Sequence, residues 1–157
     1  MARRDGGDAR MKHRRRIQIG ALVIATMIGL YLASMGGDHQ VVGCPVSGLI
    51  NCESVLSGPG SVTMGIPLAL WGALWAATGL LLPGLLRRTW RVRIGWMWAV
   101  LGVGGLIWAW THEILDGHVC LWCSVMQTLI IAAAVPSDIW CFRARRDPFG
   151  NTHPAGS

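Results

Sequence analysis

Four long apolar runs separated by polar segments dominate the sequence. They are Ile17–Met35, Ile66–Leu86, Ile94–Thr111 and Val119–Val135. A helix needs about 20 mostly apolar residues to cross the hydrocarbon core of a bilayer, and each run approaches that length. With 52% hydrophobic residues and a mean hydropathy of +0.44, the chain is too apolar for an ordinary soluble domain. The pattern predicts an all-α membrane protein, a bundle of four transmembrane helices surrounded by lipid.

The polar segments between these runs give the predicted domain organisation. Residues 1–16 are polar and basic, which predicts a disordered arm. Gly36–Gly65 is the one sizeable external loop, in which we expect Glu53–Ser57 to form a single helical turn before a Gly-Pro-Gly turn signal. Residues 17–141 then form one membrane domain, and residues 142–157 form a short tail.

The basic residues indicate how the bundle is oriented. All 14 Lys and Arg lie in three segments: before Ile17, in Arg87–Arg93 and in Arg143–Arg146. With four spans these segments share one side of the membrane, and the positive-inside rule assigns that side to the cytoplasm. We therefore expect the protein to lie in a bacterial inner or plasma membrane with both termini in the cytoplasm. The net charge of +6 reflects this orientation, and we expect no nucleic-acid partner.

Cysteine positions provide the candidate chemistry. Cys44 and Cys52 lie in the external loop, Cys120 and Cys123 open the fourth run, and Cys141 lies on the opposite side. Cysteines at i and i+3 of a helix share one face and can form a disulfide. Amide groups at a helix start stabilise a thiolate. The outer side is oxidising and the cytoplasm reducing, so we expect Cys141 to be a free thiol.

Other interpretations of the four outer cysteines remain open. Two structural disulfides are one, although a CxxC pair closes almost no chain and gains little loop entropy. A closed zinc site is another. A carrier for a soft metal such as mercury would also use paired thiols, but only Cys141 lies on the far side. A structural subunit with incidental disulfides is a further alternative. We favour a redox relay without a metal, because short CxxC pairs are typical of exchange chemistry.

The arrangement resembles the vitamin K epoxide reductase family over residues 17–141. Four spans, a loop cysteine pair after the first span and a CxxC opening the fourth follow the family's order. The sequences Cys52-Glu-Ser-Val-Leu-Ser57 and Gly65-Ile-Pro67-Leu-Ala-Leu-Trp-Gly72 are similar to its bacterial branch.

The resemblance implies a quinone-dependent thiol oxidoreductase that drives disulfide formation in exported proteins. A ubiquinone, menaquinone or vitamin K-type quinone would oxidise Cys120 and Cys123. Cys120 would exchange with Cys52, and Cys44 would meet a separate thioredoxin-like protein on the outer side. Reduction of vitamin K epoxide or quinone proper is the alternative activity.

Five residues are candidate quinone contacts. Cys123 lies one helical turn, about 5 Å, deeper than Cys120. Gln127 shares its face and occupies the position of a Tyr in the vertebrate branch, which argues against the epoxide as substrate. A helix–helix hydrogen bond is the alternative role for Gln127. Trp71 and Trp122 lie near the cysteines, and Ser57 precedes by one place a serine that relatives often have.

Two further groups of residues have predicted roles, one in proton transfer and one in helix packing. Four polar residues crowd the segment before Cys120, which we expect to be a short loop; they are His112, Glu113, Asp116 and His118. Glu113 or His118 could move protons during quinone reduction. Three glycines in the third run, Gly102, Gly104 and Gly105, predict close approach of a neighbouring helix.

Overall fold

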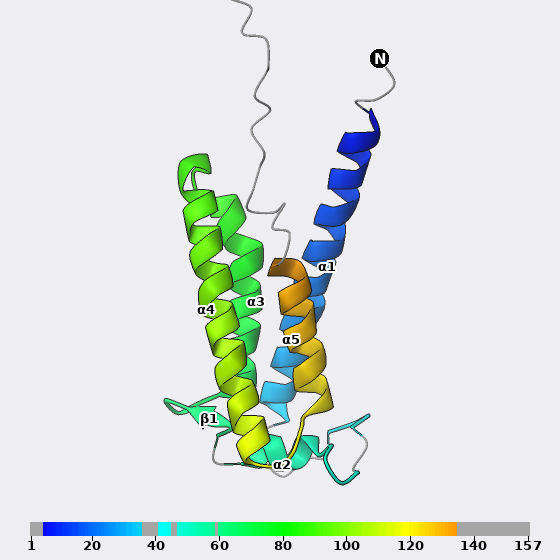
Figure 1. The fold of residues 1–157 in the computed structure, drawn as a ribbon, viewed down its shortest axis with the longest axis vertical. Coiled ribbons are helices and arrows are strands. Elements are labelled where there is room, and N and C mark those ends of the chain that lie inside the picture. The colour runs from blue at the N-terminus through cyan, green and yellow to red at the C-terminus, as the bar shows by residue number, and fades with distance from the viewer. Residues whose placement is uncertain (1–4, 36–40, 45–46, 59, 135–157) are drawn as a thin grey trace, which may run out of the picture.

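Four long helices stand side by side, and a short helix lies across one end of the bundle (Figure 1). The computed structural model describes residues 5–35, 41–44, 47–58 and 60–134. Within these residues the elements are α1 (Asp5–Ser34), α2 (Cys52–Ser57), β1 (Val62–Thr63), β2 (Ile66–Pro67), α3 (Leu68–Leu85), α4 (Arg88–Leu115) and α5 (Leu121–Ala134). The two short strands pair antiparallel as a hairpin.

Three of the helices are long and apolar enough to cross a membrane. They contain the segments Lys12–Ser34, Leu68–Leu85 and Trp90–Leu115. The fourth helix, α5, is also apolar but shorter, with 14 residues. Residues 135–157, including Cys141 and the predicted tail, lie outside the described residues. The chain is thus a predominantly helical, multi-pass membrane protein, and the fourth full span stays a prediction.

Two boundaries differ from the sequence expectation. α1 begins at Asp5, so the prediction of a disordered arm is wrong from that residue onward. Arg, Lys and Ala are good helix formers, and adding turns to an existing helix is favourable. α4 continues to Leu115, so His112 and Glu113 belong to a helix rather than to a loop. Gly117, with φ of 70°, provides the left-handed conformation that ends this helix.

The predicted helical turn in the external loop is confirmed as α2. Asn51 is its N-cap, and its side-chain oxygen accepts a hydrogen bond from the Ser54 N–H at 3.1 Å. The helix ends at Ser57, with Gly58 as its C-cap. Because α2 starts at Cys52, the cap fixes the backbone that carries one of the redox candidates.

Packing within the bundle is uneven. α1 packs closely along both α3 and α5, whereas α4 packs only sparingly on its neighbours. A Cβ at Gly29 would lie 2.8 Å from the Ala69 carbonyl oxygen, so α1 and α3 approach as closely as a glycine permits. α4 is joined to α3 mainly through Trp98, which stacks on Trp75 and donates a hydrogen bond to the Thr78 hydroxyl at 3.0 Å.

The glycines of α4 have different surroundings. A Cβ at Gly102 would lie 2.7 Å from the indole nitrogen of Trp75, as the expected close approach requires. Gly104 and Gly105 have nothing within 4 Å of such a Cβ, so no described neighbour uses the close approach that these two glycines permit.

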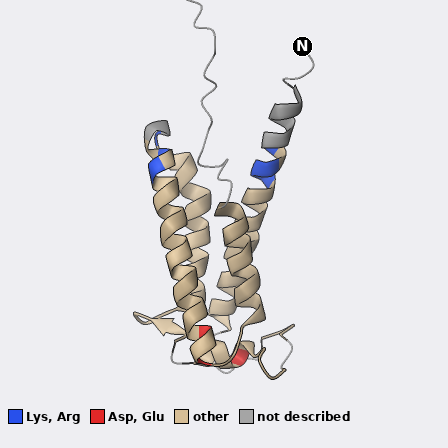
Figure 2. Ribbon diagram, in the orientation of Figure 1, with Lys and Arg blue, Asp and Glu red and all other residues tan. Residues whose placement is uncertain are grey.

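Charged residues separate along the bundle axis (Figure 2). The coloured Lys and Arg residues lie at one end of the ribbon, whereas the coloured Asp and Glu residues lie at the end closed by α2. This separation follows from the sequence pattern, because the basic segments flank the same ends of the apolar runs. The end with α2 carries the cysteines.

The close contact between α1 and α3 gives a stability test. We expect Gly29→Ala to destabilise the protein by about 1–3 kcal/mol, because the added methyl group meets a backbone carbonyl and the Ala73 side chain. Gly20→Ala on the same helix is the matched control. It meets nothing within 4 Å and should stabilise by up to about 1 kcal/mol through helix propensity. Thermal unfolding in detergent, followed by circular dichroism, checks both; equal effects would contradict the packing described here.

Candidate functional site

Cys44, Cys52, Cys120 and Cys123 belong to one cluster at the α2 end of the bundle. Cys44 and Cys52 form a disulfide with a Cα–Cα distance of 6.2 Å, whereas Cys120 and Cys123 are free thiols. Cys52 and Cys120 are both buried, at 1% and 0% exposure, in the same apolar cluster. Cys44 and Cys123 pack against this cluster. Residues far apart in sequence thus come together in one compact group.

Backbone hydrogen bonds hold the loop against the start of α5. The Val119 N–H donates to the Leu49 carbonyl at 2.8 Å, and the Asn51 N–H donates to the Val119 carbonyl at 3.2 Å. These bonds form a parallel bridge between Ile50 and Val119. Cys120 directly follows Val119, and Cys52 lies two residues after Ile50, so the bridge brings both cysteines into the same buried cluster.

Cys120 takes the N-cap position of α5. Its carbonyl accepts a hydrogen bond from the Ser124 N–H at 3.0 Å, and its sulfur accepts one from the Cys123 N–H at 3.3 Å. The Cys120 sulfur thus has a backbone N–H donor at the start of a helix, an arrangement that stabilises a thiolate. A thiol with stabilised thiolate character is suited to disulfide exchange.

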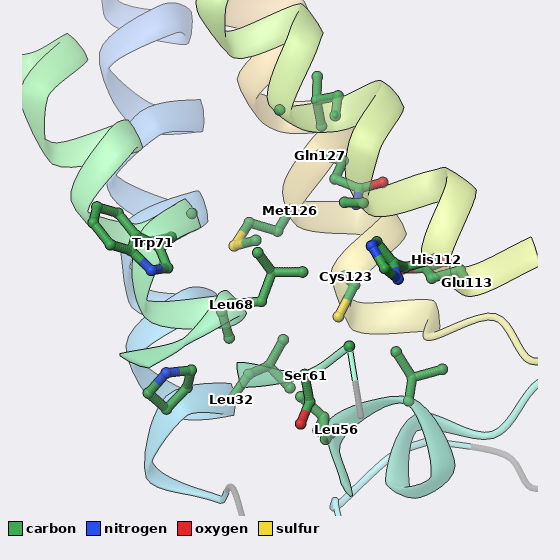
Figure 3. Close-up of a pocket in the computed structure, with 18 of the residues that line it drawn as sticks. Leu32, Leu56, Ser61, Leu68, Trp71, His112, Glu113, Cys123, Met126 and Gln127 are labelled. Atoms are coloured by element: carbon green, nitrogen blue, oxygen red, sulfur yellow. The ribbon is translucent and has the colours of Figure 1, made fainter. Parts of the chain in front are cut away.

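A large cavity opens where α4 diverges from its neighbours (Figure 3). Its volume is about 660 Å³, and its walls come from all five described helices and the hairpin, with Leu32 as the contribution of α1. Most of the wall is apolar, with Leu68, Leu101 and Ile130 among the lining residues. The polar lining residues are Ser57, Ser61, His112, Glu113, Asp116 and Gln127. A mostly apolar cavity with a few polar groups is typical of a site for a small apolar ligand.

Cys123 connects the cysteine cluster to this cavity. Its side chain lines the cavity (Figure 3), whereas Cys120 belongs to the buried cluster and is not among the described residues that line the cavity. The two sulfurs therefore have different neighbours: Cys120 faces the loop disulfide and Cys123 faces the cavity. This division gives each cysteine of the CxxC a distinct chemical environment.

Three other predicted quinone contacts also lie at the cavity wall. Gln127 is buried, and its side-chain oxygen accepts a hydrogen bond from the Trp110 indole N–H. That bond orients the amide so that its nitrogen remains a donor. Trp71 lines the cavity and donates to the Thr63 carbonyl at 3.3 Å, and the Ser57 hydroxyl donates to the Glu53 carbonyl at 2.7 Å.

Trp122 has a different place from the one expected. It packs against the cysteine cluster, on the side of Gly43, and is not among the described residues that line the cavity. Helical geometry explains the difference, because adjacent residues project about 100° apart and Cys123 occupies the cavity-facing position. The indole N–H of Trp122 is buried without a hydrogen-bond partner in the described structure.

Two residues of the site were missed from the sequence. Met126 lies three residues after Cys123, on the same helix face, and packs against Gly72 across the cavity. That spacing could have identified it. The Tyr31 hydroxyl accepts a hydrogen bond from the Val42 N–H at 3.2 Å and so ties the loop before Cys44 to α1. No local sequence signal indicates this long-range contact.

The polar residues before Cys120 separate into two groups. His112, Glu113 and Asp116 line the cavity, and Glu113 is only 7% exposed. His118 lies in the turn after α4, where its ring contacts the Asp116 carbonyl at 2.9 Å. Across the described residues, no three His, Cys, Asp or Glu side chains are grouped as a metal site would require.

Comparison with known proteins identifies the family. The model of the vitamin K epoxide reductase family matches residues 17–137, which include every helix from the apolar part of α1 to α5. Searches of curated proteins and of solved structures gave no significant match. Because the family match spans most of the chain, the protein belongs to the vitamin K epoxide reductase family of membrane oxidoreductases, which link thiol chemistry to quinones.

Proposed function

We propose that this protein oxidises a separate thioredoxin-like partner at the outer face of the membrane and passes the electrons to a quinone. The partner in turn introduces disulfides into exported proteins. One observation carries the proposal. Four cysteines form a continuous series from the loop to the cavity, with Cys44 at one end and Cys123 at the other.

The order of the sulfurs gives the order of exchange. A thiolate of the partner attacks Cys44 and breaks the Cys44–Cys52 bond. The partner's second thiol then displaces Cys44 from the mixed disulfide, so that both loop cysteines become thiols. Cys52 attacks Cys120 and breaks the Cys120–Cys123 disulfide, releasing the Cys123 thiolate. Cys44 then attacks Cys52, which restores the loop disulfide and releases Cys120. The structure, with a loop disulfide and two free thiols at α5, corresponds to the end of this sequence.

The cavity residues fit a quinone as the acceptor. A cavity of about 660 Å³ accommodates a ring system with part of an isoprenoid chain, and its apolar walls suit both. The Gln127 amide nitrogen is available to donate to a carbonyl oxygen of such a ring. A bound quinone would supply the capacity to take up two electrons and two protons. Cys123 is the sulfur that lines the cavity, and we assign it the contact with the acceptor.

The orientation of the bundle follows the charge separation. Basic side chains at one end assign that end to the cytoplasm, so the cysteine cluster faces the outer compartment. An oxidising compartment preserves the loop disulfide. Cys44 is only partly buried, so on the outer side it is accessible to an exported partner protein.

Removing the sulfur at the cavity tests the relay order. In Cys123→Ala we expect the Cys52–Cys120 disulfide to accumulate, because the thiolate that resolves this bond is missing. Peptide mapping under non-reducing conditions checks it, with Cys141→Ala as the control that removes a cysteine outside the site. A Cys44–Cys52 disulfide with Cys120 free would contradict the relay and favour two structural disulfides.

Filling the cavity tests the quinone site. Gly105→Leu places a side chain into space that the cavity now occupies, and we expect it to raise KM for menadione by about tenfold or more, equivalent to about 1.4 kcal/mol. Gly104→Leu is the matched control, because Gly104 lies on the same helix outside the lining. Steady-state kinetics with a reduced thioredoxin-like protein checks both. An unchanged KM in Gly105→Leu would place the acceptor elsewhere.

The proposed orientation has its own test. After mild reduction of intact cells, a membrane-impermeant maleimide should label Cys44 and leave Cys141 unlabelled, because the two lie on opposite sides in the four-span arrangement. Labelling after lysis controls for reactivity. Labelling of Cys141 in intact cells would contradict the proposed topology.

A further inference from the structure

We infer that Glu113 carries a proton between the Cys120–Cys123 pair and the acceptor in the cavity. This inference rests on the proposed function, since it concerns the same site. Glu113 is 7% exposed, lines the cavity, and lies at the same end as Cys123 (Figure 3). The backbone N–H of Cys120 donates a hydrogen bond to its carboxyl group. One side chain thus touches both the redox pair and the site of the acceptor.

The surroundings of Glu113 argue against a purely structural role. A buried carboxylate is costly unless it is paired with a cation. The described Lys and Arg side chains lie at the opposite end of the bundle, so none of them neutralises this group (Figure 2). A leucine would fill the same space without that cost. A carboxyl group that can gain and lose a proton is the feature that the position requires.

The redox step creates a need for such a group. Oxidation of the Cys120 and Cys123 thiols forms one S–S bond and releases two electrons and two protons. The quinone acceptor takes up two electrons and two protons. Because Cys120 is buried, its proton needs a path inside the protein. Glu113 accepts the proton of Cys120 and delivers it to one acceptor oxygen, and the proton of Cys123, which lines the cavity, passes to the other.

Other titratable groups face the same space. His112 and Asp116 lie on α4 beside Glu113 and line the cavity with it. A Cβ at Gly60 would lie 3.1 Å from the His112 ring nitrogen, so the segment after α2 covers this side. Cys120 and Cys123 are the groups that face Glu113 from α5. Of the carboxyl groups, Glu113 alone accepts a hydrogen bond from a residue of the redox pair in the described structure.

Glu113→Gln separates proton transfer from positioning. The glutamine oxygen still accepts the hydrogen bond from Cys120, but the amide side chain neither gains nor loses a proton near neutral pH. We expect single-turnover oxidation of the dithiol protein by menadione to slow by about 100-fold or more. Exchange between the loop disulfide and a reduced thioredoxin-like protein should be unchanged. Glu113→Asp keeps the carboxyl group, and its rate of oxidation by menadione should fall between the rates of the wild type and of Glu113→Gln. Glu53→Gln, at an exposed acid on α2, is the matched control and should behave as wild type.

A second readout needs no quinone. In quinone-free protein, the infrared difference spectrum between the dithiol and the chemically oxidised state should contain a carboxyl C=O band. We expect this band to be lost in Glu113→Gln and kept in Glu53→Gln. An unaltered band in Glu113→Gln, or equal slowing of exchange and menadione reduction, would overturn the inference. Because this arm involves no acceptor, it decides the role of Glu113 even if the wild type fails to reduce menadione, a failure that would instead contradict the proposed function.

Discussion

Two backbone hydrogen bonds, between Val119 and the segment Leu49–Asn51, fix the relation between the external loop and the start of α5. Disulfide exchange requires a thiolate to approach a sulfur closely and in line, so its rate depends on how the two chains are held. The bridge brings Cys52 and Cys120 into the same buried cluster, and the Asn51 cap fixes the helix that begins with Cys52. In the proposed relay, electrons reach the cavity through these two sulfurs, so the other parts of the site depend on this contact.

The cavity has its origin in uneven packing. α1 packs tightly on α3 and α5 through small residues, with Gly29 against Ala69 and Ala73. α4 is joined to α3 by the stacked Trp75 and Trp98, and beyond this contact the helices diverge toward the cysteine end. The two close interfaces of α1 hold the bundle together, and the sparse packing of α4 leaves room for a ligand. A bundle packed equally on all sides would have no space beside Cys123.

Much of this arrangement could be predicted from the sequence. Hydropathy gave the long helices, and the order of the cysteines gave the family. The spacing of Cys120, Cys123 and Gln127 indicated one helix face, and the first of these proved to be the N-cap. Helix ends were less predictable, because α1 and α4 continue through polar residues that form helix as readily as apolar ones. This continuation moved Glu113 from an expected loop to the cavity wall.

Long-range contacts explain the rest of what was missed. The bond between Tyr31 and Val42 and the bridge at Val119 join segments whose pairing leaves no periodic pattern in the sequence. Trp122 was expected at the ligand because it is adjacent to Cys123, yet adjacent helical residues face different directions. Proximity in sequence is therefore a poor guide to a cavity whose walls come from several helices.

The central claim is that the sulfur of Cys123 contacts the bound acceptor. Visible absorption spectroscopy of purified Cys120→Ser protein, titrated with menadione, tests this claim most directly. Without Cys120 the Cys123 thiolate has no disulfide partner on α5, and a charge-transfer band should appear that saturates with menadione. The band should vanish when Cys123→Ser is added. No band in the Cys120→Ser protein, or a band that persists without Cys123, would contradict the account.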